Sequence, residues 1–415
     1  MKILFINTED SNGGAAVVMR RIMTGLEKKY ATQNRLIVKI KRGKAGNTEA
    51  ILTGKFEIYS EKIIDRLSRS IGALYQYFPF SSKRILATVN SFRPDVINLH
   101  NTQSGFFATP LLKELSKQVP VVWTLHDMWS FTGNSAHTFG NNSWKQLKNE
   151  RWLTRVPPSI GINTGSYLLR QKRKVYRESD ITIVTPSLWL KNLAEQSPVF
   201  EDKKIHQVYN GVDTTVFYNR SKETTRSKLG LPLEAKTIMF SSNFLQKNNP
   251  WKGGTDLLTI LKLINGYTDE KITLLMLGEG KLDGAEDFAN FNIFYGGYIN
   301  NEELMSEYLS AADLFIYPTR ADNLPNVLVE SIACGTPCVT FDIGGNREII
   351  KHNYNGIIIN PFDFDLFARE TVNLIHDEKR MNEFSFNCIQ LTNERFRSED
   401  MIDAYYNLFL QRSHK

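Results

Sequence analysis

Short apolar runs recur along the whole chain, and polar loops and amphipathic segments separate them. In the first half these runs lie at residues 3–6, 36–40, 96–99, 121–125, 181–184 and 204–208. In the second half they lie at residues 237–240, 273–277, 314–317 and 338–341. Runs of this length predict strands buried on both faces, and the segments between them have a helical period. The alternation predicts an α/β fold of doubly wound parallel sheets, in which ligands bind beyond the carboxyl ends of the strands.

The chain is long enough for two domains, because its 415 residues exceed one ordinary hydrophobic core. Between residues 218 and 233 the composition shifts to Ser, Thr, Lys, Arg, Gly and Pro without periodicity, which is typical of a linker. We therefore expect one domain at 1–216 and a second at 217–396. An amphipathic helical region rich in Phe, Tyr and Leu follows at 382–410.

Composition and charge narrow the classes of function. The contents of 41% hydrophobic and 23% charged residues are those of a normal globular protein. A net charge of +7 fits an acidic partner, which nucleic acid, anionic lipid or a phosphorylated small molecule would supply. The three cysteines (Cys334, Cys338 and Cys388) lack the spacing of a zinc site, so we expect reduced, buried thiols. Neither a secretory leader nor an apolar run long enough to cross a bilayer is expected, which predicts a cytoplasmic protein.

The densest group of carboxylates, glycines and prolines lies at residues 313–348, where a strand, a loop, a helix and a second strand are expected. Asp322 precedes the helix, Glu330 lies about one turn inside it, and a Gly-Gly pair follows the second strand. Pro325 suits the first helical turn, so the free N–H groups of this helix can face an anion. We expect Asp322 and Glu330 to face one ligand.

Two glycine-containing loops precede predicted helices. Asn12, Gly13 and Gly14 follow the first strand, and Lys252-Gly253-Gly254 precedes a helix in the second half. Glycines let backbone amides approach a phosphate closely at a helix N-terminus, although Gly-Gly also fits a purely structural turn. The second loop lacks the spacing and the Ser/Thr of a P-loop, so ATPase chemistry is disfavoured.

Two histidines end strands in the first half, at His100 and at His126. A neutral imidazole at the carboxyl end of a strand can bond a sugar hydroxyl, although an isolated His is more often structural. The loop after His126 is dense in residue types that bind sugars, among them Asp127 and Trp129. The irregular segment 140–162 is long enough to be a functional lid that shapes an acceptor pocket.

Basic segments offer two interpretations each. Residues 39–44, beside aromatic residues at 75–80, fit peripheral contact with an anionic membrane, or else a solvated loop and a core helix. The basic run at 170–177 fits a nucleic-acid or lipid patch, but more often such a run marks a solvated helix face. Aromatic residues do not interleave these runs, so nucleic acid is not expected as a partner.

Taken in order, these motifs resemble the glycosyltransferases of family 4, the retaining group 1 enzymes with a GT-B fold, and in particular bacterial polysaccharide and colanic-acid-type enzymes. The most specific part is the pair of acidic residues separated by seven others and followed by Gly-Thr-Pro and Gly-Gly. The resemblance implies two facing Rossmann-like domains with an interdomain cleft. Residues 1–216 would bind the acceptor and 217–396 a nucleotide-sugar donor, and the helix at about 397–415 would pack back on the first domain.

The resemblance also implies roles for single residues. Glu330 would hold the nucleotide ribose, Asp322 and His126 would contact the donor sugar, and Lys252 would neutralise the leaving diphosphate. The full set of implied donor-binding positions is Gly13, Gly14, Lys247, Lys252, Asn323, Leu324, Pro325 and Glu330. Fixed positive charge suits a departing diphosphate. Neither a metal nor another cofactor is implied, and the acceptor would be a glycan, a lipid-linked sugar or another hydroxyl compound.

Two positions depart from the family's pattern, and a pair of aspartates imitates another motif. Asp322 stands where the family more often has Glu, and Lys247 is a candidate for the usual basic partner of Lys252. Asp363 and Asp365 imitate the Asp-x-Asp metal motif, but a helix cap is the expected role.

Three alternatives to transfer remain. A sugar-nucleotide or polysaccharide binding protein would keep the scaffold without the reaction, although it would not need Lys252, Asp322 and Glu330 together. A sugar-nucleotide epimerase would change the donor without an acceptor. A nucleic-acid binder would show a steep salt dependence.

Overall fold

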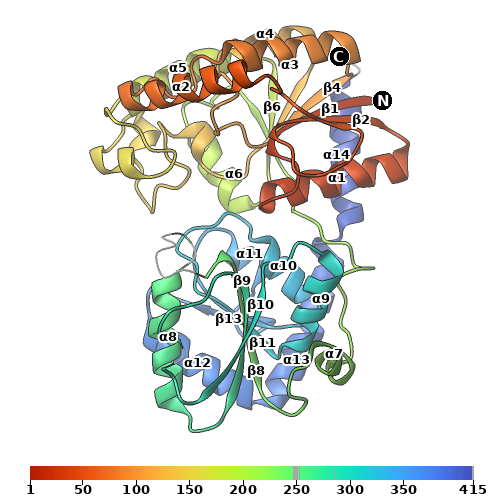
Figure 1. Cartoon of the computed structure of the whole chain (residues 1–415), viewed down its shortest axis with the longest axis vertical. Coiled ribbons are helices and arrows are strands. Elements are labelled where there is room, and N and C mark those ends of the chain that lie inside the picture. Colours follow the sequence, from red (N-terminus) through yellow and green to blue (C-terminus); the bar gives the residue numbers. More distant parts are fainter. Residues whose placement is uncertain (246–250, 252, 286, 414–415) are drawn as a thin grey trace. The chain divides into compact units, whose positions relative to one another are not determined.

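The computed structural model describes residues 1–245, 251, 253–285 and 287–413. Its contacts divide the chain into two compact units (Figure 1). The first unit contains Met1–Tyr209 together with Met401–Lys415, and the second contains Asn210–Asp400. Each unit is built on its own parallel sheet.

The first unit contains a sheet of seven described strands in the order β3-β2-β1-β4-β5-β6-β7, and all neighbouring pairs are parallel. The strands are β1 (Lys2–Glu9), β2 (Gln33–Ile40), β3 (Thr48–Ala50), β4 (Val96–Leu99), β5 (Val121–Thr124), β6 (Ile181–Thr185) and β7 (Lys204–Gln207). Apolar residues occupy most of the buried positions of the central strands β1, β4, β5 and β6, as burial on both faces requires.

Helices cover both faces of this sheet. They are α1 (Gly14–Tyr30), α2 (Lys55–Ile71), α3 (Pro79–Phe92), α4 (Leu111–Gln118), α5 (Gly165–Arg177), α6 (Leu188–Glu195) and the C-terminal α14 (Ser398–Ser413). Short 3₁₀ helices lie at Trp129–Phe131 (η1), Ser143–Gln146 (η2) and Arg151–Arg155 (η3). α1 and α14 share one core with β1, β2 and single residues of β4 to β6, whereas α3, α4 and α5 contribute to the other core.

The second unit contains a sheet of six described strands in the order β10-β9-β8-β11-β12-β13, again all parallel. The strands are β8 (Thr237–Phe244), β9 (Ile272–Glu279), β10 (Phe291–Gly297), β11 (Leu314–Tyr317), β12 (Cys338–Phe341) and β13 (Gly356–Ile359). Its helices are α7 (Lys222–Leu229), α8 (Gly254–Tyr267), α9 (Glu302–Ala311), α10 (Asn326–Ala333), α11 (Asn346–Ile349), α12 (Phe364–His376) and α13 (Glu378–Arg395).

Both sheets reverse their strand order at one point, between β1 and β4 in the first unit and between β8 and β11 in the second. The loops that leave neighbouring strands at such a switch point run apart, and the crevice between them is where ligands of this architecture bind. The predicted α/β class and doubly wound parallel sheets are confirmed.

Two predicted segments differ in the structure. The expected linker at 218–233 contains α7, whose ends carry a Ser221 N-cap and a left-handed Gly230. The expected helix at 382–410 is interrupted between α13 and α14, because the backbone there pairs with another segment. Val212 donates to Phe396 and accepts from Ser398.

The three cysteines are buried, as predicted, and none of them is placed in a disulfide. Burial raises the pKa of the Cys334 thiol to about 11 and that of Cys338 to about 12. Within the described residues, no helix is both long and apolar enough to span a membrane.

Candidate functional site

The loop after β1 is shaped by a glycine at its end. Gly13 has φ 86° and ψ 158° and is the N-cap residue of α1, where its carbonyl accepts from Ala16 and Val17. That positive φ favours glycine over any other residue. A Cβ at Gly13 would meet no atom within 4 Å, so the space beside this backbone is open. Gly14 follows as the first residue of α1.

A buried carboxylate ties the basic segment 39–44 to this loop. Asp10 Oδ1 and Oδ2 accept from the amides of Arg42 (2.9 Å) and Gly43 (2.8 Å). Burial alone would raise the pKa of Asp10, but these amides and Arg20 hold it below its ordinary value. Arg42 pairs with Glu9 at 3.0 Å. This basic segment is therefore built into the rim of the sheet.

The two predicted histidines lie in direct contact. His100 Nδ1 and His126 Nε2 are 2.9 Å apart, and His100 Nε2 lies 2.8 Å from Asn98 Oδ1. The amide of Asn98 donates to Val122 O (3.0 Å), which turns its oxygen toward His100. His100 therefore donates from Nε2 and accepts at Nδ1, and His126 donates from Nε2. The contact with His100 thus fixes the orientation of His126, for which the sequence indicated no partner.

This hydrogen-bonded chain reaches the C-terminal helix. Asn98 Nδ2 also lies 3.2 Å from Thr124 Oγ1, and that hydroxyl lies 3.0 Å from the hydroxyl of Tyr405 in α14. All of these groups lie in the first unit. No sequence pattern indicated that Asn98 and Tyr405 support His126, because the two residues are far apart in the chain.

A second buried group holds the loop after His126. Asp127 accepts from the amide of Trp129 (2.8 Å) and from the side chain of Gln103. The same loop is held by Lys172 in α5, which donates to Trp129 O (2.5 Å) and Thr132 O (2.9 Å). The Nζ atom of Lys172 also lies 3.8 Å from the centre of the Trp129 ring. Lys172 is only 2% exposed.

Lys172 corrects the interpretation of the basic run at 170–177 as a uniformly solvated face. Arg170, Lys174 and Arg177 are exposed, but Lys172 is buried with Leu168 and Tyr176. Leu168, Lys172 and Tyr176 are spaced by four residues, so they share one helix face. That spacing was the signal that could have identified the buried lysine.

Burial favours the uncharged form of each group, so it lowers the pKa of the two histidines and raises the pKa of Asp127. Burial lowers the pKa of His126 to about 4, and burial together with the neighbouring His126 lowers the pKa of His100 well below its ordinary value. Burial raises the pKa of Asp127 to about 6, and Lys172 opposes this rise. At neutral pH both imidazoles are uncharged, which suits hydrogen bonds to hydroxyl groups.

In the second unit, the loop after β11 carries Asp322. Its Oδ2 accepts from Tyr317 (2.6 Å) and its Oδ1 from the amide of Asn323 (2.9 Å). The Gly-Gly turn after β12 packs on the same backbone. A Cβ at Gly344, which has φ +60°, would lie 1.9 Å from Asp322 O. Gly345 donates to Asn323 O at 2.7 Å.

The loop before α8 packs just as closely against the loop after β11. A Cβ at Gly253, which has φ +68°, would lie 2.0 Å from Pro318 O. Arg320 binds both oxygens of Asp256 at 2.6 Å. Lys247 and Lys252, both predicted to bind the donor, lie outside the described residues. Gly253 follows Lys252 directly, so the backbone next to that lysine is held against the rim.

The remaining predicted donor-binding residues gather at the start of α10. Pro325 is the N-cap residue of this helix, one position before the predicted first turn, with φ −67° and ψ 117°. Asn323, Leu324 and Glu330 are 3%, 4% and 8% exposed. The structure therefore brings Asp322, Asn323, Leu324, Pro325 and Glu330 together on one loop and the helix that follows it.

Asp363 and Asp365 do not form a metal site with other acidic residues. Asp363 caps α12 by accepting from Leu366 (3.0 Å), as predicted. Asp365 accepts from Tyr267 and pairs with Arg369. Among the residues that the structure describes, no group of three or more His, Cys, Asp or Glu is arranged to hold a metal ion.

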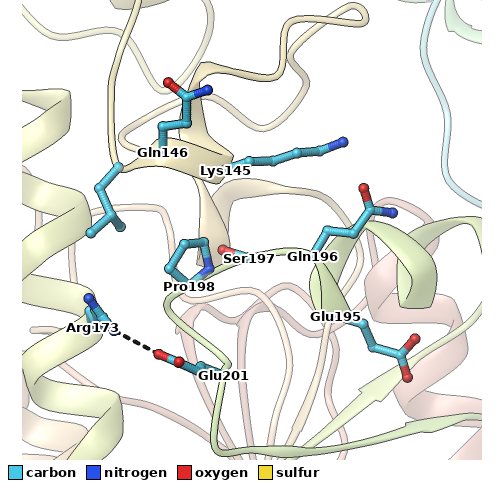
Figure 2. A pocket seen from close by; sticks show the side chains of 9 residues that line it. Lys145, Gln146, Arg173, Glu195, Gln196, Ser197, Pro198 and Glu201 are labelled. Carbon is cyan, nitrogen blue, oxygen red and sulfur yellow. Dashed lines mark hydrogen bonds and ion pairs between the residues drawn. The ribbon is translucent and has the colours of Figure 1, made fainter.

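The irregular segment predicted as a lid forms one wall of a hollow of about 540 Å³ in the first unit (Figure 2). The hollow is lined by Lys145, Gln146, Leu147, Arg173, Glu195, Gln196, Ser197, Pro198 and Glu201. Arg173 and Glu201 are joined by an ion pair of 2.6 Å. The hollow is polar and open, so it offers hydrogen-bonding groups to a hydroxyl-rich compound.

Two family models match nearly the whole chain between them. The model "Glycosyltransferase Family 4" matches residues 12–216, and the model "Glycosyl transferases group 1" matches residues 221–390.

Two curated relatives are distant and match over about half of their length. The N-acetyl-alpha-D-glucosaminyl L-malate synthase of Bacillus anthracis is 26% identical over 50% of this chain and 54% of its own. The putative colanic acid biosynthesis glycosyl transferase WcaC of Escherichia coli is 24% identical over 58% of this chain and 56% of its own. The chain thus spans about half the length of each of these two relatives.

A solved structure shares the fold over its full length. HepE from Anabaena, determined in complex with UDP-glucose, has a TM-score of 0.66 and 15% identity, and the match covers 99% of this chain and 100% of HepE. At this identity the likeness shows the fold alone.

Proposed function

Because this chain belongs to the group 1 glycosyltransferases and has a family 4 glycosyltransferase region in its first half, we propose that it transfers a sugar from a nucleoside-diphosphate sugar to a hydroxyl acceptor. The observation that carries the proposal is the cluster at the start of α10. There Asp322 has a fixed orientation, Glu330 is buried, and a helix N-terminus follows a proline. A helix N-terminus attracts anions, and buried carboxylates bind hydroxyl groups.

The donor-binding roles follow from the chemistry of these groups. Glu330 accepts hydrogen bonds from the ribose, and Asp322 accepts one from a hydroxyl of the donor sugar. The amide at Leu324, together with Lys252 and Lys247, stabilises the negative charge of the diphosphate. Tyr317 supports this role for Asp322, because its hydroxyl fixes the shorter carboxylate at 2.6 Å.

The first unit contributes to the reacting end of the donor. The backbone of Gly13 lies beside open space at the start of α1, and the amides of Gly13 and Gly14 meet the leaving diphosphate. His126, held by His100, bonds the donor sugar near its anomeric carbon. A neutral imidazole suits this role, since a cation there would repel the positive charge that develops on the sugar.

The reaction keeps the anomeric configuration and uses no metal. The bond between the anomeric carbon and the diphosphate oxygen breaks, and a bond to the acceptor oxygen forms on the same face. The acceptor proton moves to the departing phosphate oxygen. Fixed positive charge and amide donors stabilise the negative charge that develops on the diphosphate, and such stabilisation usually lowers the barrier more than any other single effect.

A cell-surface glycan or its lipid-linked precursor is the proposed acceptor. The relative WcaC is named for colanic acid biosynthesis. The polar hollow between η2, α5 and α6 has room for sugar units.

A thermal-shift screen against UDP, GDP and ADP sugars tests the donor. One nucleotide should raise the melting temperature, because a ligand that binds only the folded state stabilises it. No response to any nucleotide would contradict the proposal. Chelation of divalent metals with EDTA should leave the transfer rate unchanged, and an EDTA-sensitive rate would refute a metal-free reaction.

The two alternative functions, binding alone and epimerisation, can be distinguished by what happens to the donor. A binding protein would respond in the screen without consuming the donor. An epimerase would convert the donor sugar in the absence of any acceptor, which NMR of the nucleotide sugar detects.

A further inference from the structure

Helix α2 presents its apolar side chains to solvent. Phe56, Tyr59, Ile63, Leu67 and Ile71 are 75%, 64%, 60%, 59% and 60% exposed. They are spaced by three or four residues, so they form one stripe along the helix. Figure 1 shows α2 at the periphery of the first unit. An apolar stripe of five large side chains on a surface helix marks an interaction site.

The inner side of α2 carries buried polar groups beside the partly buried Ile64, whereas the inner side of an ordinary surface helix is mainly apolar. Glu61 is 3% exposed and accepts from the amide of Ser81 at 2.7 Å. Asp65 pairs with Arg69 at 2.9 Å, and Arg69 donates to the hydroxyl of Tyr75. These contacts fix the orientation of α2. The exposure of the stripe therefore follows from how the helix is held, and the stripe is not a frayed end.

The charged residues of α2 that are fully exposed are all cations. Lys55, Lys62 and Arg66 are exposed beside the apolar stripe. Two of the three carboxylates of α2, Glu61 and Asp65, are turned to the inner contacts described above. A stripe with large apolar side chains and flanking cations is the pattern of a helix that lies in the headgroup region of an anionic bilayer.

The apolar surface continues past the end of α2. The amide of Gly161 donates to Arg69 O at 2.8 Å, which places the loop after η3 beside the last turn of the helix. Ile162 in this loop is 56% exposed. The surface is thus wider than one helix.

We propose that α2, with the adjoining loop at Ile162, docks the first unit on the surface of an anionic lipid bilayer. The apolar stripe enters the acyl boundary while Lys55, Lys62 and Arg66 meet the lipid headgroups. This docking is independent of the transfer reaction. The segment 39–44 is engaged within the first unit, because Arg42 pairs with Glu9 and Lys41 donates to Thr48 O.

Vesicle co-sedimentation tests the docking directly. The full chain should sediment with vesicles of phosphatidylglycerol and phosphatidylcholine in equal parts, and much less with phosphatidylcholine alone. Binding should weaken as salt is added, because the cations act through screened attraction. Equal or absent binding to both kinds of vesicle would overturn the proposal.

Two sets of variants separate the apolar and the charged contribution. Ile63→Ser with Leu67→Ser should reduce vesicle binding at least tenfold. Lys55→Gln with Lys62→Gln and Arg66→Gln should reduce it about a hundredfold, since each cation near an anionic surface contributes roughly fivefold. The matched control in the second unit is Phe386→Ser with Lys379→Gln, two exposed residues of α13, which should bind as the wild type does. Wild-type binding by either α2 variant would overturn the proposal.

A fluorescent label reports insertion without relying on affinity. The three native cysteines are buried, so Ile63→Cys can be labelled selectively with an environment-sensitive dye. Its emission should shift to shorter wavelength on anionic vesicles, and the same label at Phe386→Cys should not respond. Self-association is the competing outcome. A wild-type dimer that Ile63→Ser with Leu67→Ser converts to monomer, without vesicle binding, would assign the stripe to a second copy and reject the lipid surface.

Discussion

The two sheets have similar strand orders, but their rims are held in different ways. In the first unit, buried side chains fix the rim, through the contact of His100 with His126 and the bonds of Lys172 to the loop of Trp129. In the second unit, backbone approach fixes the rim, because Gly253 and Gly344 lie against the carbonyls of Pro318 and Asp322. The first rim therefore responds to protonation, whereas the second tolerates almost no added atom.

This difference matches the chemistry proposed for each rim. A nucleoside diphosphate needs a rigid set of amides, which close backbone packing provides. A sugar ring is bound through hydroxyl groups, which neutral imidazoles and amide side chains can bond in either direction. Substitutions in the first rim should therefore act through lost hydrogen bonds and altered protonation, whereas substitutions in the second rim should act through steric overlap.

The largest expected effect is that of Gly344→Ala. Its Cβ would lie 1.9 Å from Asp322 O at a φ of +60°, so overlap and backbone strain together should cost about 4 kcal/mol. Urea unfolding of the second unit measures this loss. The matched control is Gly230→Ala, where φ is +68° and no atom lies within 4 Å, and it should cost about 1 kcal/mol. Equal costs would show that close packing does not hold the second rim.

Next in size is Lys172→Met. The change leaves Trp129 O and Thr132 O without their buried donor and removes the cation beside Asp127. Loss of the buried donor shared by these two carbonyl oxygens should cost roughly 3 kcal/mol. Arg170→Met, at an exposed position of the same helix, should change the free energy of unfolding by less than about 0.5 kcal/mol. Similar values for the two variants would remove Lys172 from the framework of the first rim.

A smaller effect is expected in the pH dependence of stability. Because the pKa of His126 is lowered in the folded protein, His126 contributes stability above pH 6.5, its ordinary pKa. This contribution is lost as the pH falls toward about 4. The raised pKa of Asp127 has the opposite sign, since its contribution is complete below 3.8 and is lost as pH rises through about 6.

Asp127→Asn should therefore steepen the loss of stability between pH 6 and pH 4 by up to about 1.4 kcal/mol per pH unit relative to wild type. His126→Asn should make the same curve shallower by a similar amount. Urea unfolding at several pH values gives both slopes. Curves parallel to the wild type would contradict the assigned environments.

The smallest effect is expected for Tyr405→Phe. The variant removes only the hydroxyl that lies 3.0 Å from Thr124 Oγ1, so it should cost about 1 kcal/mol. The control Tyr267→Phe, at an exposed site in the second unit, should change stability less. If the tyrosine supports His126 through Thr124 and Asn98, turnover should also fall slightly in Tyr405→Phe alone.

The sequence predicted the two sheets well. It predicted the rim of the second unit better than the rim of the first unit. Buried parallel strands are continuous apolar runs, so the strands at 3–6, 96–99 and 314–317 were recognisable without neighbours. The family was predicted from the order of the motifs along the chain, of which the spacing of Asp322 and Glu330 was the most specific, and it is confirmed. Both residues lie on one loop and helix, so local sequence was sufficient to join them.

The first rim could not be predicted in the same way, because it joins residues from four distant segments. Asn98, His126, Lys172 and Tyr405 meet only after the sheet has formed. Lys172 was hidden among exposed cations, and only its spacing with Leu168 and Tyr176 separates it from them. α7 was hidden in a polar segment, although Ser221 and Gly230 are ordinary helix caps.

The most direct test of the central claim is nucleoside-diphosphate release with the donor found by screening and a lipid-linked or glycan acceptor. The wild type should release one nucleoside diphosphate for each sugar transferred, and Lys252→Ala should slow this release about a hundredfold. Lys379→Ala, at an exposed position in α13, should behave as the wild type does. Donor that stays intact with every acceptor, or full activity in Lys252→Ala, would contradict the account.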